Sequence, residues 1–472
     1  PDSELFNYAY GYYSSGPWLA AGPFGQPTYA ISNNVVGGVR GLGVLEEDKF
    51  DTIQGMVAYI DSTSNTGYMV GDIKLAALSD TDDTDVVGTE LVTNGTFDTD
   101  TGWVKGTGWT ISGGTAVATN VVSGVQLQQN ITISVAGTYT ISVDIVDTAS
   151  TYSVTCGTLG TGAINTTGVV TMTGYLASGT HSVHVGAWSS GFTGTVDNVS
   201  VRLADTDRSV NANGLAVHGT ITKSAVATGA DLVGYSFGTS SSCLQQPYNA
   251  DLNYGTGDFC YMGWVKSSSI PNDWTYIFER TNPSGGSRFM LHLRSSDILE
   301  TYTNLSGTGT SAQSFTDLGS WKSGNWRHIA LVRTGGRMYA YGDGVQSSQH
   351  FANTVNYAGI GDEVLTLGSR FSHDDQFAGE MALWRTSATA PSASQIKTIY
   401  NAEKVLFQEN SQATLYGTSD AVTALAHDDS TNLLHVGTSS GRSVFQGLRR
   451  VDNTTTAVGA AISAANGLIA ED

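Results

Sequence analysis

The fold is decided by residues 326–345, which read WRHIALVRTGGRMYAYGDGV. Two runs rich in β-branched and aromatic residues, 326–333 and 338–345, lie in this stretch and predict two strands. Further runs of the same kind occur at 257–266, 365–369 and 377–384. We therefore expect an all-β domain built around this stretch.

One convincing helix follows these strands. Ser392 and Gln395 have the spacing of a capping box, in which each side chain accepts from the other residue's backbone N–H. An apolar stripe then follows on one face, formed by Ile396, Ile399 and Tyr400. The helix is expected to close the all-β domain.

The order of these strands, with a helix after Ala390-Pro391-Ser392, resembles the concanavalin A-like, laminin-G-type fold of lectins and glucanases. The resemblance implies a β-sandwich with a terminal helix. One departure concerns a turn. The family usually has Asp-Gly after a Tyr-Val pair, whereas here Gly342 precedes Asp343, and we interpret this as a change in turn geometry.

Residues 88–204 contain short runs in which apolar and polar residues alternate, such as 139–145 and 199–203. Many short strands in one region favour a two-sheet jelly roll. The motifs ELVTNGTF (90–97) and VDNVSV (196–201) stand at the two ends of the region. They resemble those of carbohydrate-binding-module-like, galactose-binding-like jelly rolls.

The two ends of the chain resemble each other. AYIDST (58–63) precedes YMVG (68–71), and AHDDST (426–431) precedes LHVG (434–437). Strand, Asx-type turn, strand and Gly in this order is typical of neighbouring β-propeller blades. We expect the two lectin-like domains to be inserted into a β-propeller-like body.

Two acidic stretches mark domain boundaries. Residues 79–85 (SDTDDTD) are expected to form a solvated linker, with a calcium site as the alternative, although the Gly and distal Glu of an EF-hand are missing. A second break falls at 203–207. The chain then divides into a β-rich, propeller-blade-like segment (1–87), a carbohydrate-binding-module-like jelly roll (88–204), a concanavalin A-like sandwich with its helix (205–405) and a second propeller-blade-like segment (406–472).

Composition and charge exclude several classes of protein. The chain has 472 residues, enough for about three domains of roughly 150 residues each. Its 57 Gly and its 14% of charged residues favour short strands and turns. With 22 Lys and Arg against 42 Asp and Glu, the net charge is −20, which disfavours nucleic acid and anionic membranes as partners. No apolar run reaches the ~18 residues that span a bilayer, so we expect no membrane insertion.

The cysteines do not form a disulfide framework. Cys156, Cys243 and Cys260 are an odd number, and no Cys-x-x-Cys pair suggests zinc. Cys260 lies in FCYMGWV (259–265), which is apolar on both faces of a strand. We interpret Cys260 as a core thiol, with a disulfide to Cys243 as the alternative.

Catalytic residues are not evident. Glycosidase chemistry needs paired carboxylates, which related glucanases place on one strand face as Glu-x-Asp-x-Glu, and that pattern is absent from the sequence. Glu279 and Glu380 are isolated acids, for which we expect salt-bridged or solvated roles. No nucleophile elbow, P-loop or dinucleotide fingerprint occurs in a usable setting. We assign no catalytic residue and expect that the protein is not an enzyme.

Metal-binding residues are also sparse. His181 and His184 are three apart in an alternating strand, so we expect them to point to opposite faces, where they cannot chelate one ion. His373, Asp374 and Asp375 could hold Ca²⁺ on a loop at the rim of the lectin-like domain, although a polar turn is the favoured interpretation. No other cofactor is expected.

Glycan binding is the function that the residues support. Aromatic faces, amides and carboxylates recognise sugars, because a sugar ring has apolar C–H faces and a hydroxyl edge. Gln126 and Gln128 alternate with apolar residues, so they are expected to share the face of a strand that points away from the core. The candidate stacking platforms are Trp103, Trp109 and Trp188, each with core packing as the alternative.

The chain as a whole, including 406–410 and 447–455, resembles tail or appendage proteins of bacteriophages, which commonly combine these two kinds of domain. The resemblance implies a virion structural protein on the particle surface that attaches to a host-cell glycan. Because the chain has few charged residues, we expect part of its surface to be apolar, and large apolar patches usually mark interfaces. We therefore also expect contacts with other virion proteins and a homo-oligomer. The alternatives are a secreted bacterial adhesin or surface-filament protein, and a polysaccharide-degrading enzyme.

Overall fold

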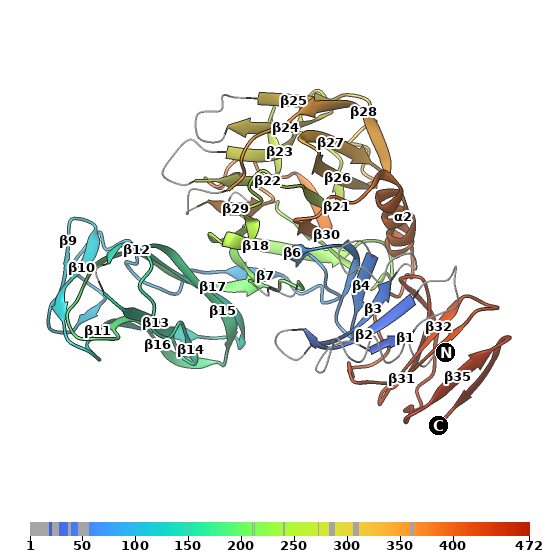
Figure 1. Ribbon diagram of the computed structural model, residues 1–472, viewed down its shortest axis with the longest axis horizontal. Helices are drawn as coiled ribbons and strands as arrows, with labels where there is room; N and C mark the ends of the chain where they lie inside the picture. Colours follow the sequence, from blue (N-terminus) through green and yellow to red (C-terminus); the bar gives the residue numbers. More distant parts are fainter. Residues whose placement is uncertain are drawn as a thin grey trace.

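The computed structural model describes residues 18–20, 28–35, 39–45 and 56–472, apart from 149, 210, 212, 239–240, 272, 283–287, 305–310 and 359–362. Over these residues the chain is nearly all-β, as expected, with one α-helix, α2 (Ala393–Glu403). Figure 1 shows a central β-sandwich, a jelly roll on one side of it, and the sheets of the chain ends on the other. No helical segment of this part has the length and apolar character that crossing a lipid bilayer requires.

The sandwich consists of two antiparallel sheets. The first has the order β28 (Val345–Ala352), β27 (Arg337–Gly342), β26 (Trp326–Thr334), β21 (Phe259–Ser267) and β30 (Gly379–Ser387). The second has the order β25 (Ser311–Phe315), β24 (Ile298–Asn304), β23 (Arg288–Arg294), β22 (Thr275–Thr281), β29 (Val364–Leu367), β20 (Cys243–Gln246) and β18 (Leu215–Ala225). The decisive stretch of sequence therefore forms the hairpin β26–β27 and leads into β28.

The turn between β27 and β28 corrects one expectation. Asp343 and Gly344 have φ of 52° and 71°, and Gly342 pairs with Val345. Positive φ at both central residues is the mark of a tight two-residue hairpin turn, for which Asp-Gly is favoured. The turn is thus an ordinary Asp-Gly turn, and Gly342 is the last residue of β27.

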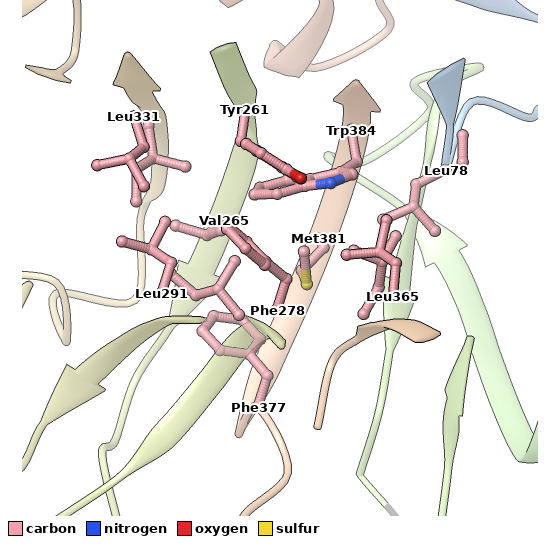
Figure 2. Packing of buried hydrophobic residues seen from close by; sticks show 14 of the residues in the cluster. Leu78, Tyr261, Val265, Phe278, Leu291, Leu331, Leu365, Phe377, Met381 and Trp384 are labelled. Carbon is pink, nitrogen blue, oxygen red and sulfur yellow. The ribbon is translucent and has the colours of Figure 1, made fainter. Parts of the chain in front are cut away.

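The main core lies between the two sheets. Figure 2 shows Tyr261 and Trp384 from the first sheet pointing toward Phe278 and Leu365 from the second. The rings of Tyr261 and Phe278 are stacked, with centroids 4.4 Å apart and planes 12° from parallel. Burying each such side chain contributes roughly 1.5–3 kcal/mol, so this interface is the main source of the sandwich's stability.

The jelly roll is inserted into the sandwich. Before it, β6 (Ile73–Ala77) pairs with β30, and β7 (Val86–Gly88) pairs with β18. After it, β18 pairs in turn with β20, β7 and β19 (Val233–Ser236), and β19 pairs with β30, so that β18 joins the two sheets. Strands from the expected N-terminal segment 1–87 therefore belong to the sandwich.

The jelly roll has two antiparallel sheets. One has the order β9 (Trp109–Ser112), β10 (Thr115–Val121), β17 (Phe192–Asp205), β12 (Gly137–Thr148) and β15 (Gly168–Leu176). The other has the order β8 (Val104–Lys105), β11 (Gln126–Ile133), β16 (Gly179–Ala187), β13 (Tyr152–Cys156) and β14 (Leu159–Gly160). A separate apolar core, which includes the buried Cys156, fills the space between them.

The helix α2 begins as predicted. Ser392 Oγ accepts from Gln395 N at 3.2 Å, and Gln395 Oε1 accepts from Ser392 N at 2.8 Å, which completes the capping box. At the other end, Glu403 is fully buried and forms an ion pair with Arg385 of β30. Sequence spacing does not reveal this pair, because the two residues lie on different elements.

The ends of the chain lie side by side (Figure 1). The N-terminal sheet contains β1 (Trp18–Ala20), β2 (Thr28–Val35), β3 (Val39–Leu45), β4 (Met56–Ile60) and β5 (Asn65–Val70). The C-terminal sheet contains β31 (Val422–Asp428), β32 (Leu433–Thr438), β33 (Gly441–Gln446) and β34 (Arg449–Asn453). A hairpin of β35 (Ile462–Ala465) and β36 (Leu468–Glu471) follows it. Leu415 N donates to Asp61 O at 2.9 Å, and Asn65 Nδ2 donates to Leu448 O at 3.0 Å.

The two similar motifs form similar turns. Asp61 Oδ1 accepts from Thr63 N at 2.8 Å, and Asp428 Oδ1 accepts from Ser430 N at 2.9 Å, so each turn is closed by an aspartate. A wider β-propeller body stays a prediction, and much of residues 1–55 lies outside the described residues.

The cysteines are free, buried thiols. Cys260 is 1% exposed and packs in an apolar cluster, which agrees with a core thiol. Burial raises the pKa of Cys243 to about 12 and that of Cys156 to about 11. All three are therefore protonated near neutral pH.

Candidate functional site

The outward face of β11 carries the predicted pair of amides. Burial alternates along this strand: Leu127 and Gln129 are buried, whereas Gln126 and Gln128 are partly exposed. Alternate residues of a strand point to the same side. The two amides therefore share the face that points away from the core.

The register of the sheet places a histidine and a glycine beside these amides. Gln128 lies opposite His184, and Gln126 lies opposite Gly186 of β16. Opposed residues in such pairs have Cβ atoms about 4.5–5.5 Å apart, within reach of each other's side chains. A Cβ at Gly186 would lie 3.0 Å from Gln126 Cγ, so the glutamine side chain covers the glycine.

His184 adds a neutral imidazole to this face. Burial lowers the pKa of His184 below its usual value, and its Nδ1 is buried without a hydrogen-bond partner among the described residues. His181 lies on the other face of β16, which it shares with the buried Val183. Its Nε2 lies 2.8 Å from Ala177 O. The two histidines thus lie on opposite faces, as expected.

Trp188 is the exposed aromatic residue at the end of β16. It is 55% exposed and directly follows the last residue of β16, two residues beyond Gly186. Its backbone is fixed by a bond from Trp188 N to Thr151 O (3.2 Å) and by one from Ser123 Oγ to Trp188 O (2.9 Å). We name Gln126, Gln128, His184, Gly186 and Trp188 the β11–β16 face.

The other two tryptophans are core residues. Trp103 is 8% exposed, donates from Nε1 to Asn94 O at 3.0 Å, and packs with its ring centroid 5.2 Å from that of Phe97. Trp109 is 4% exposed and packs at 5.8 Å from Phe192. Neither ring is free to stack on a sugar, so the predicted stacking role does not hold for Trp103 and Trp109.

The two isolated acids are both engaged in the sandwich. Glu279 is 1% exposed, its Oε2 accepts from Phe371 N at 2.8 Å, and its Oε1 lies 3.8 Å from Arg288 Nε. Burial raises the pKa of Glu279 above its usual value. Glu380 pairs with Lys266 at 2.9 Å. Both acids are salt-bridged.

The predicted calcium loop is organised around a guanidinium. Arg370 Nη1 lies 3.4 Å from Asp374 and 3.9 Å from Asp375, so a cation already faces both carboxylates. The ring of His373 packs against that of His218, with centroids 4.8 Å apart and planes tilted by 53°, and its Nε2 lies 3.1 Å from Gln245 Nε2. In the part of the chain described, no cluster of three or more His, Cys, Asp or Glu could hold a metal ion.

One polar cluster was missed by the sequence analysis. On β23 and β24, His292 Nε2 lies 3.1 Å from Glu300 Oε1, and Arg294 Nη1 donates to the same oxygen at 3.1 Å. The hydrogen bond from His292 lowers the pKa of Glu300 to about 2. The ring of Trp274 stacks on that of His292, with centroids 4.6 Å apart, and the guanidinium carbon of Arg294 lies 4.8 Å from the centre of the Trp274 ring. The Trp274 ring is therefore occupied by protein groups. Only the strand register, which pairs His292 with Glu300, could have revealed this cluster.

Residues 237–397 match the family model of the concanavalin A-like lectin/glucanases superfamily. The match covers the strands from β20 to β30 and the first residues of α2. This segment is therefore a lectin-like domain of the concanavalin A type, as its resemblance implied. The chain as a whole matches no curated protein.

Several solved structures are similar to part of this chain. One is domain 4 of AbnA, an extracellular GH43 arabinanase from Geobacillus stearothermophilus, in complex with arabinotriose (16% identity, covering 39% of this chain and 82% of that chain, TM-score 0.30). Another is the CBM40 of Ruminococcus gnavus IT-sialidase bound to α2,6 sialyllactose (11% identity, covering 31% of this chain and 85% of that chain, TM-score 0.28). A third is the binding domain of Paraclostridial Mosquitocidal Protein 1 (14% identity, covering 51% of this chain and 62% of that chain, TM-score 0.35). With TM-scores below 0.5, these likenesses support no statement about the site.

Proposed function

We propose that the protein is a non-enzymatic glycan-binding protein whose β11–β16 face contacts the sugar. The observation that carries this proposal is the placement of two amides and a neutral imidazole on one side of one sheet, with an exposed indole just beyond the end of β16. Amide and imidazole groups exchange hydrogen bonds with sugar hydroxyls, and an indole ring packs on the apolar C–H face of a sugar. Because Gly186 has no side chain, the Gln126 side chain can lie across the face at this position.

The setting we propose is the surface of a bacteriophage particle, where the protein would be part of a tail fibre or another appendage. The resemblance of the sequence to such proteins supports this setting. In it, the partners are copies of the same chain, other virion proteins and a glycan of the host cell. A secreted bacterial adhesin is the second candidate, because it would use the same face in the same way.

The binding site is tested by substitutions on the β11–β16 face of the full chain. Gln126→Ala, Gln128→Ala and Trp188→Ala should each weaken retention on host cells and on a glycan array about tenfold or more, since losing one such contact costs on the order of 1–3 kcal/mol. Thr132→Ala is the control, because Thr132 is exposed on the same side of β11 but at its far end.

Thermal stability separates binding from folding in this test. The four variants should melt within a few degrees of the parent, because the substituted side chains lie on the surface. If Gln126→Ala and Gln128→Ala bind host cells like the parent, the β11–β16 face is not the glycan site and the jelly roll is a spacer.

A further inference from the structure

A cavity of about 490 Å³ lies where the chain ends meet the sandwich. Three segments far apart in the sequence form it: residues 62–83, the hairpin β18–β19, and residues 414–450. Small-molecule sites are typically concave, about 300–1,000 Å³ in volume, and combine apolar walls with a few placed polar groups. The cavity has this size, and its lining is more polar than apolar.

One wall of the cavity carries a fixed guanidinium. Arg450 donates from Nε to Thr414 O at 2.8 Å and from Nη2 to Gln412 Oε1 at 2.8 Å, and its guanidinium lies 5.8 Å from the centre of the Tyr416 ring. These contacts hold the group in place before a ligand arrives. A ligand would therefore lose little side-chain entropy at this wall.

Two carboxylates also line the cavity, and one of them lies beside Arg450. Asp231 Oδ2 accepts from Ala413 N at 3.0 Å and lies 3.9 Å from Arg450 Nη2. Asp83 belongs to the acidic stretch 79–85 and is exposed at the cavity. Its neighbour Asp80 pairs with Lys223 at 3.0 Å. Two carboxylates against one guanidinium give the lining a net negative charge.

The apolar part of the lining is small. Val233, Leu415 and Ala230 are buried, with 1%, 2% and 9% of their surface exposed, so Ala225 is the exposed aliphatic side chain of the lining. Ala225 and the ring of Tyr416 suit a small apolar face, whereas the polar groups suit a ring of hydroxyl groups. The negative lining disfavours a carboxylate, sulfate or phosphate on the ligand.

We propose that this cavity is a second saccharide site, distinct from the β11–β16 face, and that it takes one neutral hexose unit. The C–H face of the hexose lies against Ala225 and Tyr416. Its hydroxyls donate to Asp83 and Asp231 and accept from Arg450. Carboxylates are strong acceptors for hydroxyl donors, and this arrangement satisfies both edges of the sugar.

The test uses methyl β-galactoside and methyl β-glucoside as neutral probes and N-acetylneuraminic acid as the anionic probe. Saturation-transfer NMR is measured on the full chain carrying Gln126→Ala and Gln128→Ala, so that the β11–β16 face does not contribute. At least one neutral probe should give a signal in this background. The anionic probe should give none.

Two further variants locate the signal. Ala225→Trp fills the cavity from an exposed position, and Asp83→Asn removes an acceptor that makes no structural contact among the described residues; both should reduce the signal at least fivefold. Glu409→Gln is the matched control, because Glu409 is exposed and outside the cavity. Three outcomes would overturn the inference. Both neutral probes give no signal, both cavity variants give the same signal as their parent, or the anionic probe binds more strongly than the neutral probes. None of these outcomes bears on the β11–β16 face.

Discussion

Replacing Arg385 with Met is expected to destabilise the sandwich strongly, because it leaves the carboxylate of Glu403 buried without its counter-charge. The side chains of this pair are only 2% and 0% exposed. Glu403 Oε2 also accepts from Trp264 Nε1 at 2.7 Å, and Oε1 accepts from Tyr68 N at 2.9 Å. The carboxylate thus ties the end of α2 to β21, β30 and β5.

The magnitude follows from this geometry. Removing one partner of a buried pair costs about 3–5 kcal/mol. In a domain of 150–250 residues each kcal/mol lowers the melting temperature by roughly 2–4 °C, so Arg385→Met should lower it by about 6–20 °C. Glu403→Ala should cost more, because it also leaves the two N–H donors of Trp264 and Tyr68 unpaired, at about 1–3 kcal/mol each.

The assay is calorimetric melting of the full chain. Lys404→Ala is the matched control: Lys404 follows Glu403 directly, but its Nζ is exposed and bonds only to Asn401 Oδ1 (3.0 Å) among the described residues. This control should change the free energy of unfolding by no more than about 0.5 kcal/mol. A melting temperature of Arg385→Met equal to that of Lys404→Ala would refute the reasoning.

Three other predictions concern the same chain. Burial raises the pKa of Asp205 to about 6, above 3.8 for the ordinary group, so the folded state takes up a proton first as the pH falls. As the pH falls from about 7 to about 4, the contribution of Asp205 should therefore increase the free energy of unfolding, and Asp205→Asn should remove that gain; equal pH profiles of the two proteins would contradict this. Trp103→Ala should cost about 3–5 kcal/mol through the cavity it leaves in the jelly roll, and an unchanged melting temperature would place the ring outside the core. Incubation with host polysaccharide should release no reducing ends, whereas hydrolysis that Glu279→Gln or Glu380→Gln abolishes would show that the protein is an enzyme.

Local spacing was enough to predict several features. The strands of the decisive hairpin, the capping box of Ser392 and Gln395, and the shared face of Gln126 and Gln128 all depend on residues a few positions apart. Such residues are held together by the backbone geometry of one strand or one helix, whatever the rest of the chain does. The aspartate-closed turns of the two ends follow from the same local rule.

The candidate site could be predicted only in part. The sequence placed the two glutamines and Trp188 among the candidates, but it could not separate Trp188 from Trp103 and Trp109. All three occur in similar alternating surroundings. Whether an indole is 55% or 4% exposed depends on which sheet packs over it, and local pattern does not contain that information.

The sequence by itself determined that this is an all-β protein with a lectin-like segment, and which residues alternate on each strand. Only the tertiary structure decided that the jelly roll interrupts the sandwich, that Arg385 and Glu403 meet in its core, and that three distant segments enclose a cavity. The physical reason is that pairing between strands and burial of side chains depend on long-range packing. Each requires a partner that is often a hundred or more residues away, and it is set by the packing of the whole chain rather than by the period of any one strand.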